Sequence, residues 1–126
     1  MSRGSGKDWR LHDQIIAHIP EGFWTSYYEL AQAVESHPIA VGQRIASHPV
    51  EGAWRVMTWD GRASAGFAWP DGSPHEGRDV VDVLREEGIR FGDDGKADKS
   101  QQLGSSALLA LVGAERDDDE FGAENE

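Results

Sequence analysis

The sequence predicts a mainly α-helical domain that carries one small β-hairpin. Three observations lead to this prediction. Two short helical patterns are separated by a break at Ser36-His37-Pro38. The segment Trp54 to Trp59 alternates like a strand and is followed by Asp60-Gly61, a strong signal for a hairpin turn. An amphipathic stretch from Glu76 to Glu87 ends at Gly88, a residue that suits the C-terminal cap of a helix.

Two helices are predicted before the break. Apolar residues in the segment from Asp8 to His18 recur about every 3.6 residues, the period of an amphipathic helix. Thr25 or Ser26 is placed to cap the second helix, with Glu29 in capping-box position. We expect this second helix to run to about Glu35.

The third helix is predicted at Ile39 to Ser47, with Pro38 in its first turn and His48-Pro49 as its stop. Two short helices joined by a tight turn form the helix-turn-helix pattern. Small residues in the second of these helices would allow close approach to a groove. The hairpin, with Arg62 to Phe67 as its returning strand, would add a wing.

In the rest of the chain, the sequence predicts a short strand at Ile89-Arg90-Phe91 and a last helix at Leu103 to Val112. We expect a flexible leader at residues 1–7, one domain at residues 8–113 and a disordered acidic tail at residues 114–126. The 126 residues suffice for a single small domain with a modest core.

The net charge of −11 is unevenly distributed. From Glu115 onward there are seven acidic residues and one arginine, so residues 1–114 carry −5. The segment from Ile39 to Met57 contains two arginines, Arg44 and Arg55, and one acidic residue, Glu51. A nonspecific DNA-binding protein is usually far more basic. The charge therefore favours weak, shape- or lesion-dependent DNA binding, or binding that needs a partner.

The sequence contains no cysteine, which excludes disulfides, thiolate zinc sites and thiol nucleophiles. The five histidines show no metal-ligand spacing, and we expect neither a metal nor a cofactor. No apolar run is long enough to span a bilayer, and the first residues lack the apolar core of a signal peptide. We expect a cytoplasmic monomer.

A series of short motifs between residues 8 and 98 resembles the DNA-binding domain of the alkylguanine-DNA alkyltransferases. Each motif is weak alone, but their order and spacing are fairly specific. The matching pieces are Ser26-Tyr27, Ile39-Ala40-Val41-Gly42, His48-Pro49, Gly52-Ala53-Trp54-Arg55-Val56, Asp60-Gly61-Arg62 and Glu87-Gly88-Ile89-Arg90-Phe91. The resemblance implies a winged helix-turn-helix-like domain of that family.

In the active family a cysteine attacks the alkyl group and the adjacent histidine activates it. The matching positions here are Ala53 and Trp54. A methyl group is no nucleophile and an indole does not deprotonate a thiol, so alkyl transfer is excluded. The chain resembles the alkyltransferase-like proteins, which bind alkylated guanine without repairing it. We therefore expect a binding protein and no enzyme.

The resemblance also implies how a base is rotated out of the duplex. Tyr27 matches the family's phosphate-rotating tyrosine, and Ile39 stands where the family has an arginine finger. An apolar wedge fills a vacated stack sterically, as in other DNA-bending proteins. The residues expected to contact DNA are Ser26, Tyr27, Ile39, Ala40, Gln43, Arg44 and Ser47. Those expected to form the base pocket are Tyr27, Ala53, Trp54, Val56 and Phe67.

Each of these residues also has a purely structural interpretation. Tyr27 packs equally well on a core, and Arg55 suits a buried ion pair as well as a DNA contact. Core packing is the simpler role for any single member of the aromatic group Trp54, Trp59, Phe67 and Trp69. Gln43 and Arg44 are expected to be exposed.

Two functions remain open at this stage. The first is recognition of alkylated or otherwise modified bases in double-stranded DNA, with nucleotide excision repair proteins as partners implied by the resemblance. The second is a winged helix-turn-helix module for regulation or protein interaction without lesion recognition. The missing arginine finger, the acidic net charge and the sparse basic face favour the second.

Overall fold

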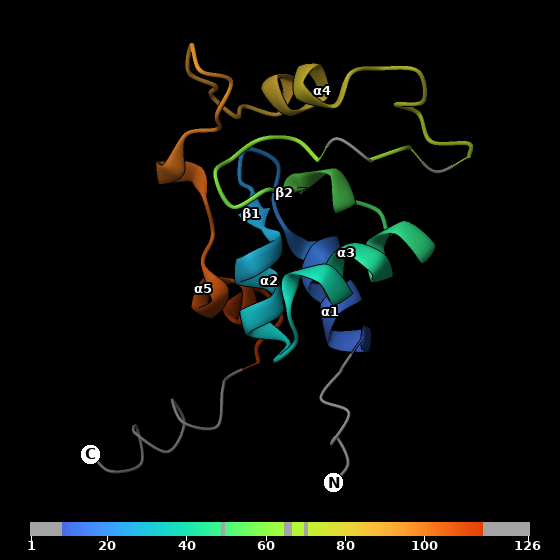
Figure 1. The fold of residues 1–126 in the computed structure, drawn as a ribbon, viewed down its shortest axis with the longest axis vertical. Coiled ribbons are helices and arrows are strands. Elements are labelled where there is room, and N and C mark those ends of the chain that lie inside the picture. The colour runs from blue at the N-terminus through green and yellow to red at the C-terminus, as the bar shows by residue number, and fades with distance from the viewer. Residues whose placement is uncertain (1–8, 49, 65–66, 70, 115–126) are drawn as a thin grey trace, which may run out of the picture.

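The computed structural model describes residues 9–48, 50–64, 67–69 and 71–114, so the predicted leader and nearly all of the predicted tail lie outside the described residues. Figure 1 shows a helical half that holds α1, α2, α3 and α5, a half dominated by α4, and a small sheet between them. The elements in chain order are α1 (Trp9–His18), β1 (Thr25–Ser26), α2 (Tyr27–Ala33), α3 (Pro38–Ser47), the 3₁₀ helix η2 (Ala53–Arg55), β2 (Val56–Met57), α4 (Val80–Glu86), the 3₁₀ helix η3 (Lys99–Gln101) and α5 (Ser105–Leu111).

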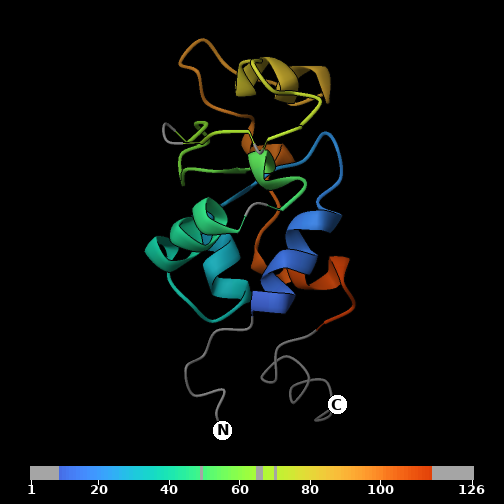
Figure 2. The same ribbon diagram turned by 90° about the vertical axis from the view of Figure 1, so that its right-hand side faces the viewer.

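The helical half is organised around α2, which lies between α3 on one side and α5 on the other (Figures 1 and 2). An isolated helix as short as α2 is unstable in water, so burial against its neighbours stabilises it. The buried apolar residues of this half are Ile15, Ile16, Ile19, Leu30, Ala31, Ala33, Val34, Val41, Ile45, Ala53, Val56, Leu108 and Leu109.

The turn between α2 and α3 closes as a Schellman motif. The amide of Ser36 donates to the carbonyl of Ala31 at 2.8 Å, and that of Glu35 donates to the carbonyl of Gln32 at 3.3 Å. Glu35 adopts a φ of 59°, the left-handed conformation that glycine usually supplies in this motif. The helix-turn-helix predicted from the break at Ser36 is therefore present, with α2 ending at Ala33 instead of Glu35.

The predicted hairpin is wrong. Val56 and Met57 pair in parallel with Thr25 and Ser26, two segments that lie far apart in the sequence. The expected turn does form, because the amide of Thr58 donates to the carbonyl of Arg62 at 2.9 Å. No strand follows it among residues 62–64 and 67–69.

Burial explains why the parallel pairing is preferred. All four paired residues are at most 2% exposed, so the sheet joins the two halves of the core. Trp54 and Arg55, expected to begin the strand, belong to η2 instead. The amide of Arg55 donates within that turn to the carbonyl of Gly52 at 3.0 Å.

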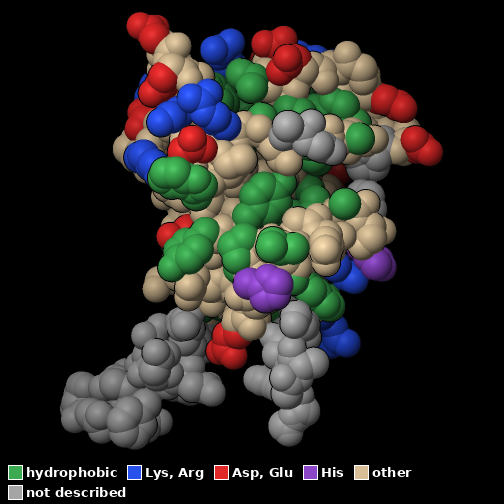
Figure 3. All heavy atoms as spheres, in the orientation of Figure 1, with side chains coloured by type: hydrophobic (Ala, Val, Ile, Leu, Met, Phe, Trp, Pro, Cys, Tyr) green, Lys and Arg blue, Asp and Glu red, His purple; other side chains and the backbone are tan. Residues whose placement is uncertain are grey.

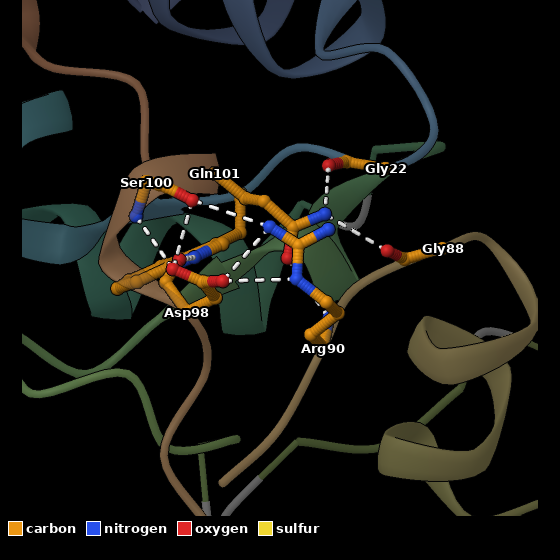
Figure 4. Close-up of polar contacts among 7 residues, drawn as sticks. Gly22, Gly88, Arg90, Asp98, Ser100 and Gln101 are labelled. Carbon is orange, nitrogen blue, oxygen red and sulfur yellow. Dashed lines mark hydrogen bonds and ion pairs between the residues drawn. The ribbon is translucent and has the colours of Figure 1, made fainter.

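The second half is built on Trp24, which is 0% exposed and packs with residues below α4. Its backbone pairs with the C-terminal segment, since the amide of Leu103 donates to the carbonyl of Trp24 at 2.7 Å. Figure 4 shows the same segment tied to two further loops by Gln101, whose Nε2 donates to the carbonyls of Gly22 at 3.1 Å and Gly88 at 2.8 Å. The C-terminal segment thereby connects both halves.

Three further predicted elements are shorter than expected. The helix expected from Glu76 begins at Val80, because the side chain of Asp79 accepts from the amide of Val81 at 2.8 Å and caps it there. The strand expected at 89–91 is reduced to a single bridge between Phe91 and Ala97. The last helix spans Ser105–Leu111 within the predicted range.

The mainly α-helical class with one small sheet is thus confirmed, and the sheet is a parallel pair. Within the described part of the chain, no helix is long and apolar enough to cross a membrane.

Two glycine substitutions test the backbone geometry. Gly52 has a φ of +97°, and an added Cβ would lie 2.9 Å from the carbonyl oxygen of Ile16. We expect Gly52→Ala to lower the free energy of unfolding by about 1–3 kcal/mol in urea titrations. Gly42 is the matched control, because its Cβ would meet nothing closer than Tyr27 at 4.0 Å. Gly42→Ala should raise the free energy of unfolding by about 0.5–1 kcal/mol, and a loss there would contradict this account of α3.

Candidate functional site

An apolar pocket of about 480 Å³ lies between the start of α2, one face of α3, η2 and the segment after the Asp60 turn. This volume falls within the range of about 300–1,000 Å³ that small-molecule sites occupy. Figure 3 shows the corresponding face, where hydrophobic side chains cross the middle and most charged side chains lie toward the periphery. The lining residues are Tyr27, Pro38, Ile39, Gly42, Ile45, Ala46, Val50, Ala53, Trp54, Ser64, Phe67 and Ala68.

Four of the five predicted pocket residues line this cavity. Tyr27, Ala53, Trp54 and Phe67 come together there, whereas Val56 is 2% exposed and belongs to β2 and the core. Sequence reasoning missed the contribution of α3. Its pocket residues Pro38, Ile39, Gly42, Ile45 and Ala46 share one helical face, and that spacing was the available signal.

The floor of the pocket is fixed by a polar cluster behind it. Trp54 is 4% exposed, and its Nε1 donates to Oε2 of Glu87 at 3.0 Å. Arg55 donates to both oxygens of the same carboxylate at 2.8 Å, and to the carbonyl of Ile19 at 2.7 Å. The guanidinium also lies 5.1 Å from the centroid of the Trp54 ring. Of the two roles left open for Arg55, the structure shows the buried ion pair.

A stripe of uncharged side chains forms the outer face of α3. Ile39, at the first turn, is 70% exposed. Gln43, Ala46 and Ser47 follow it on the surface, and Ala40 is half-buried. The Ser47 hydroxyl donates to the carbonyl of Gln43 at 2.9 Å. This convex, small-residue surface borders the pocket directly, because Ile39 and Ala46 belong to both.

The expectation that Arg44 is exposed is wrong. Its side chain is 21% exposed, its Nη2 donates to Oδ2 of Asp13 at 2.8 Å, and its guanidinium lies 5.6 Å from the Trp9 ring centroid. The carboxylate of Asp13 on α1 holds this guanidinium away from solvent, because the hydrogen bond between them is charge-assisted. Arg44 thus joins α3 to α1.

His12 completes this α1–α3 contact. It is 0% exposed, and its Nδ1 lies 2.8 Å from Oδ1 of Asp13. A carboxylate only accepts hydrogen bonds, so Nδ1 donates and Nε2 stays unprotonated, buried and without a hydrogen-bond partner. Burial lowers the pKa of His12 below its ordinary 6.5, against the opposing pull of Asp13. Burial would raise the pKa of Asp13, but hydrogen bonds from Arg44 and His12 outweigh it and lower that pKa.

Ser26 and Tyr27 lie at the start of α2. Ser26 is 1% exposed, and its Oγ accepts from the amide of Glu29 at 3.0 Å, so it is the predicted cap but not a surface residue. The capping box is not completed, because Glu29 instead accepts from the amide of Ser105 at 2.8 Å. Tyr27 is half-buried at the rim of the pocket.

The predicted aromatic group divides into two. Trp69 packs against both Trp54 and Phe67, with ring centroids 5.2 and 5.1 Å away. His75 joins them, 5.1 Å from the Trp54 ring. Trp59, by contrast, is 73% exposed in the turn after β2. Packing is therefore the role of the first three, although Trp54 and Phe67 still present a surface to the pocket.

The side chains at the two positions expected for a nucleophile and its activating base suit binding of a ligand and not alkyl transfer. The position expected for a nucleophile is the methyl group of Ala53, and the neighbouring indole donates its only N–H to Glu87. In the described residues, no group of three or more His, Cys, Asp or Glu is arranged to hold a metal ion.

Comparison with solved structures supports the fold. The chain is similar to S. pombe Atl1, solved in complex with damaged DNA containing O6-carboxymethylguanine, with a TM-score of 0.53. The two are 24% identical, and the match covers 77% of this chain and 97% of that chain. No protein-family model and no curated protein matches the chain. The match therefore shows that this chain and that protein share a fold.

The Glu87 cluster predicts a large stability effect. The Arg55 and Glu87 side chains are 12% and 8% exposed. We expect Glu87→Ala to lower the free energy of unfolding by about 3 kcal/mol, because it leaves a buried guanidinium without its counter-charge. The double variant Arg55→Met/Glu87→Met removes both charges and should lose less, measured by urea titration with Trp fluorescence. A double variant as unstable as the single one would show that charge pairing is not the cause.

The His12 contact predicts a pH dependence. Because the folded pKa lies below 6.5, the unfolded chain binds this proton first as the pH falls. The free energy of unfolding should therefore decrease as the pH falls below 6.5, by up to about 1.4 kcal/mol per pH unit, until the folded pKa is reached. His12→Gln should show a flatter profile in thermal melts over the same range, with the other four histidines retained. Parallel profiles would refute this assignment.

Proposed function

We propose that this protein is an alkyltransferase-like protein that binds duplex DNA and holds a modified base without changing it chemically. One observation carries the proposal. An apolar pocket opens directly beside the exposed first turn of α3, and its floor is the Ala53 methyl group where a reactive thiol would stand. A pocket next to a convex helix suits a base that has left the helical stack.

Helix α3 is the element proposed to dock on DNA. Its outer face, from Ile39 through Gln43 to Ser47, carries small and uncharged side chains, so the backbone is able to approach a groove closely. Gln43 is the exposed hydrogen-bonding side chain at the centre of this face. Arg44 acts indirectly, by holding α3 on α1 through Asp13.

Ile39 and Tyr27 are proposed to keep the base extruded. Ile39 is an exposed apolar side chain at the edge of the pocket, placed to fill the gap that a rotated base leaves behind. Tyr27, which also lines the pocket, is proposed to meet the sugar-phosphate backbone of that nucleotide. The rotated base would contact the Trp54 and Phe67 rings, and base–aromatic stacking is worth about 1–3 kcal/mol per base.

The absence of any cysteine supports a binding role without alkyl transfer. A protein that only marks a modified base needs another protein to act on it. The resemblance to alkyltransferase-like proteins points to nucleotide excision repair proteins as that partner.

One observation favours a second candidate, a protein-interaction module of the same fold. The net charge of −11 opposes binding to a polyanion. Arg44, a cation expected on the proposed DNA face, is turned toward α1 and paired with Asp13. We therefore expect DNA binding to rest on the fit of the extruded base, with a weak dependence on salt.

A fluorescence titration separates the two candidates. It compares a duplex containing one O6-alkylguanine with the unmodified duplex at low and moderate salt. Lesion recognition predicts clearly tighter binding of the modified duplex at both salt concentrations. Ile39→Ala and Tyr27→Ala should each weaken that binding about 5- to 10-fold, the equivalent of about 1–1.4 kcal/mol.

Ser106→Ala is the matched control, because Ser106 is exposed on α5, on the far side of α2 from α3. This variant should bind like the unaltered protein. Equal affinity for both duplexes, or no binding even at low salt, would leave the protein-interaction module as the better account.

A further inference from the structure

We propose that the pocket is selective for uncharged adducts and discriminates against adducts that carry a carboxylate. This inference rests on the proposed function, because it concerns which modified base the same pocket accepts. It follows from the uncharged lining of the cavity and from the ion pairs made by the arginines of η2 and α3.

Among the residues that the structure describes, no Asp, Glu, Lys, Arg or His side chain lines the pocket. The polar side chains there are the Tyr27 phenol, the Ser64 hydroxyl and the Trp54 indole. The indole N–H is already donated to Glu87, which lies behind the ring and not in the cavity. The remaining hydroxyls are able to hydrogen-bond an adduct but not to neutralise one.

The arginines on η2 and α3, two of the elements that form the pocket, are committed elsewhere. Arg55 follows the floor residues directly, but its guanidinium donates to both oxygens of Glu87 and to the carbonyl of Ile19. Arg44, on the helix that forms one wall, is paired with Asp13. Recruiting either would take the arginine away from Glu87 or Asp13, and breaking such an ion pair is costly.

Pro38 removes one of the backbone donors that the start of α3 would otherwise offer to an anion. A helix N-terminus attracts anions through its free backbone amides. The first residue of α3 at the pocket wall is Pro38, which has no N–H to donate. The next residue, Ile39, presents an aliphatic side chain.

The charge of an adduct therefore weakens its binding in this pocket, and its apolar bulk strengthens it. A buried carboxylate without a counter-charge is strongly disfavoured, whereas an aliphatic substituent gains from burial in an apolar cavity. The cavity of about 480 Å³ and the small Ala53, Ala46 and Gly42 leave space for a branched alkyl group beside the base. We expect a branched alkyl adduct to bind at least tenfold tighter than an isosteric carboxylate.

The test compares three duplexes of one sequence in fluorescence titrations with the full chain. They carry O6-isobutylguanine, O6-carboxymethylguanine or unmodified guanine at the same position. Isobutyl and carboxymethyl groups have nearly the same shape and differ in charge. The expected order of affinity is isobutyl first, with carboxymethyl at least tenfold weaker.

A charge-placement series locates the effect. Ala46 is exposed and lines the pocket, so Ala46→Lys adds a cation at its wall, and Ala46→Met adds similar bulk without charge. Ala110→Lys adds the same charge on α5, remote from the pocket. Only Ala46→Lys is expected to close the gap between the two adducts.

The outcomes separate the two levels of the proposal. Equal affinity for both adducts, above that for unmodified DNA, overturns the charge selectivity and leaves lesion binding intact. Rescue by Ala110→Lys as large as that by Ala46→Lys also overturns it, because the discrimination then arises from the overall charge. No preference for either adduct over guanine overturns the proposed function and this inference with it.

Discussion

The carboxylate of Glu87 is the constraint on which the site depends. It holds the indole of Trp54 and the guanidinium of Arg55, and Arg55 in turn donates to the carbonyl of Ile19 at the end of α1. Three segments that are distant in the sequence are thereby fixed against one another. Since η2 starts at Ala53, this cluster also sets the floor of the pocket. The site is therefore supported from behind by polar bonds and presents an apolar surface in front.

The same separation of roles recurs at α3. Its single charged side chain, Arg44, turns inward to Asp13 and Trp9, and its outer face is left neutral. Charge thus serves to position the helix, and contact is left to shape and apolar surface. For an acidic chain this arrangement is consistent, because a few surface arginines would not outweigh a net charge of −11. Binding that relies on insertion of a base depends less on long-range attraction.

Local signals predicted the helices well. The break at Ser36, the cap at Ser26 and the stop after Ser47 all act within a few residues, and each appears where expected. The Asp60-Gly61 turn is also local, and it forms. The returning strand failed because strand pairing is a long-range choice. Val56 and Met57 gain more burial beside Thr25 and Ser26 than a solvent-facing hairpin would provide.

The sequence alone predicted the helix-turn-helix from local periodicity, and its resemblance to the alkyltransferase family implied the missing nucleophile and the four predicted residues that line the pocket. Only the tertiary structure decided what Arg44, Arg55 and Val56 do. Asp13 and Glu87, which neutralise the two arginines, are distant in sequence, and no local pattern predicts such a pairing. The inward turn of these charges, together with the α3 face that closes the cavity, is what makes the pocket apolar.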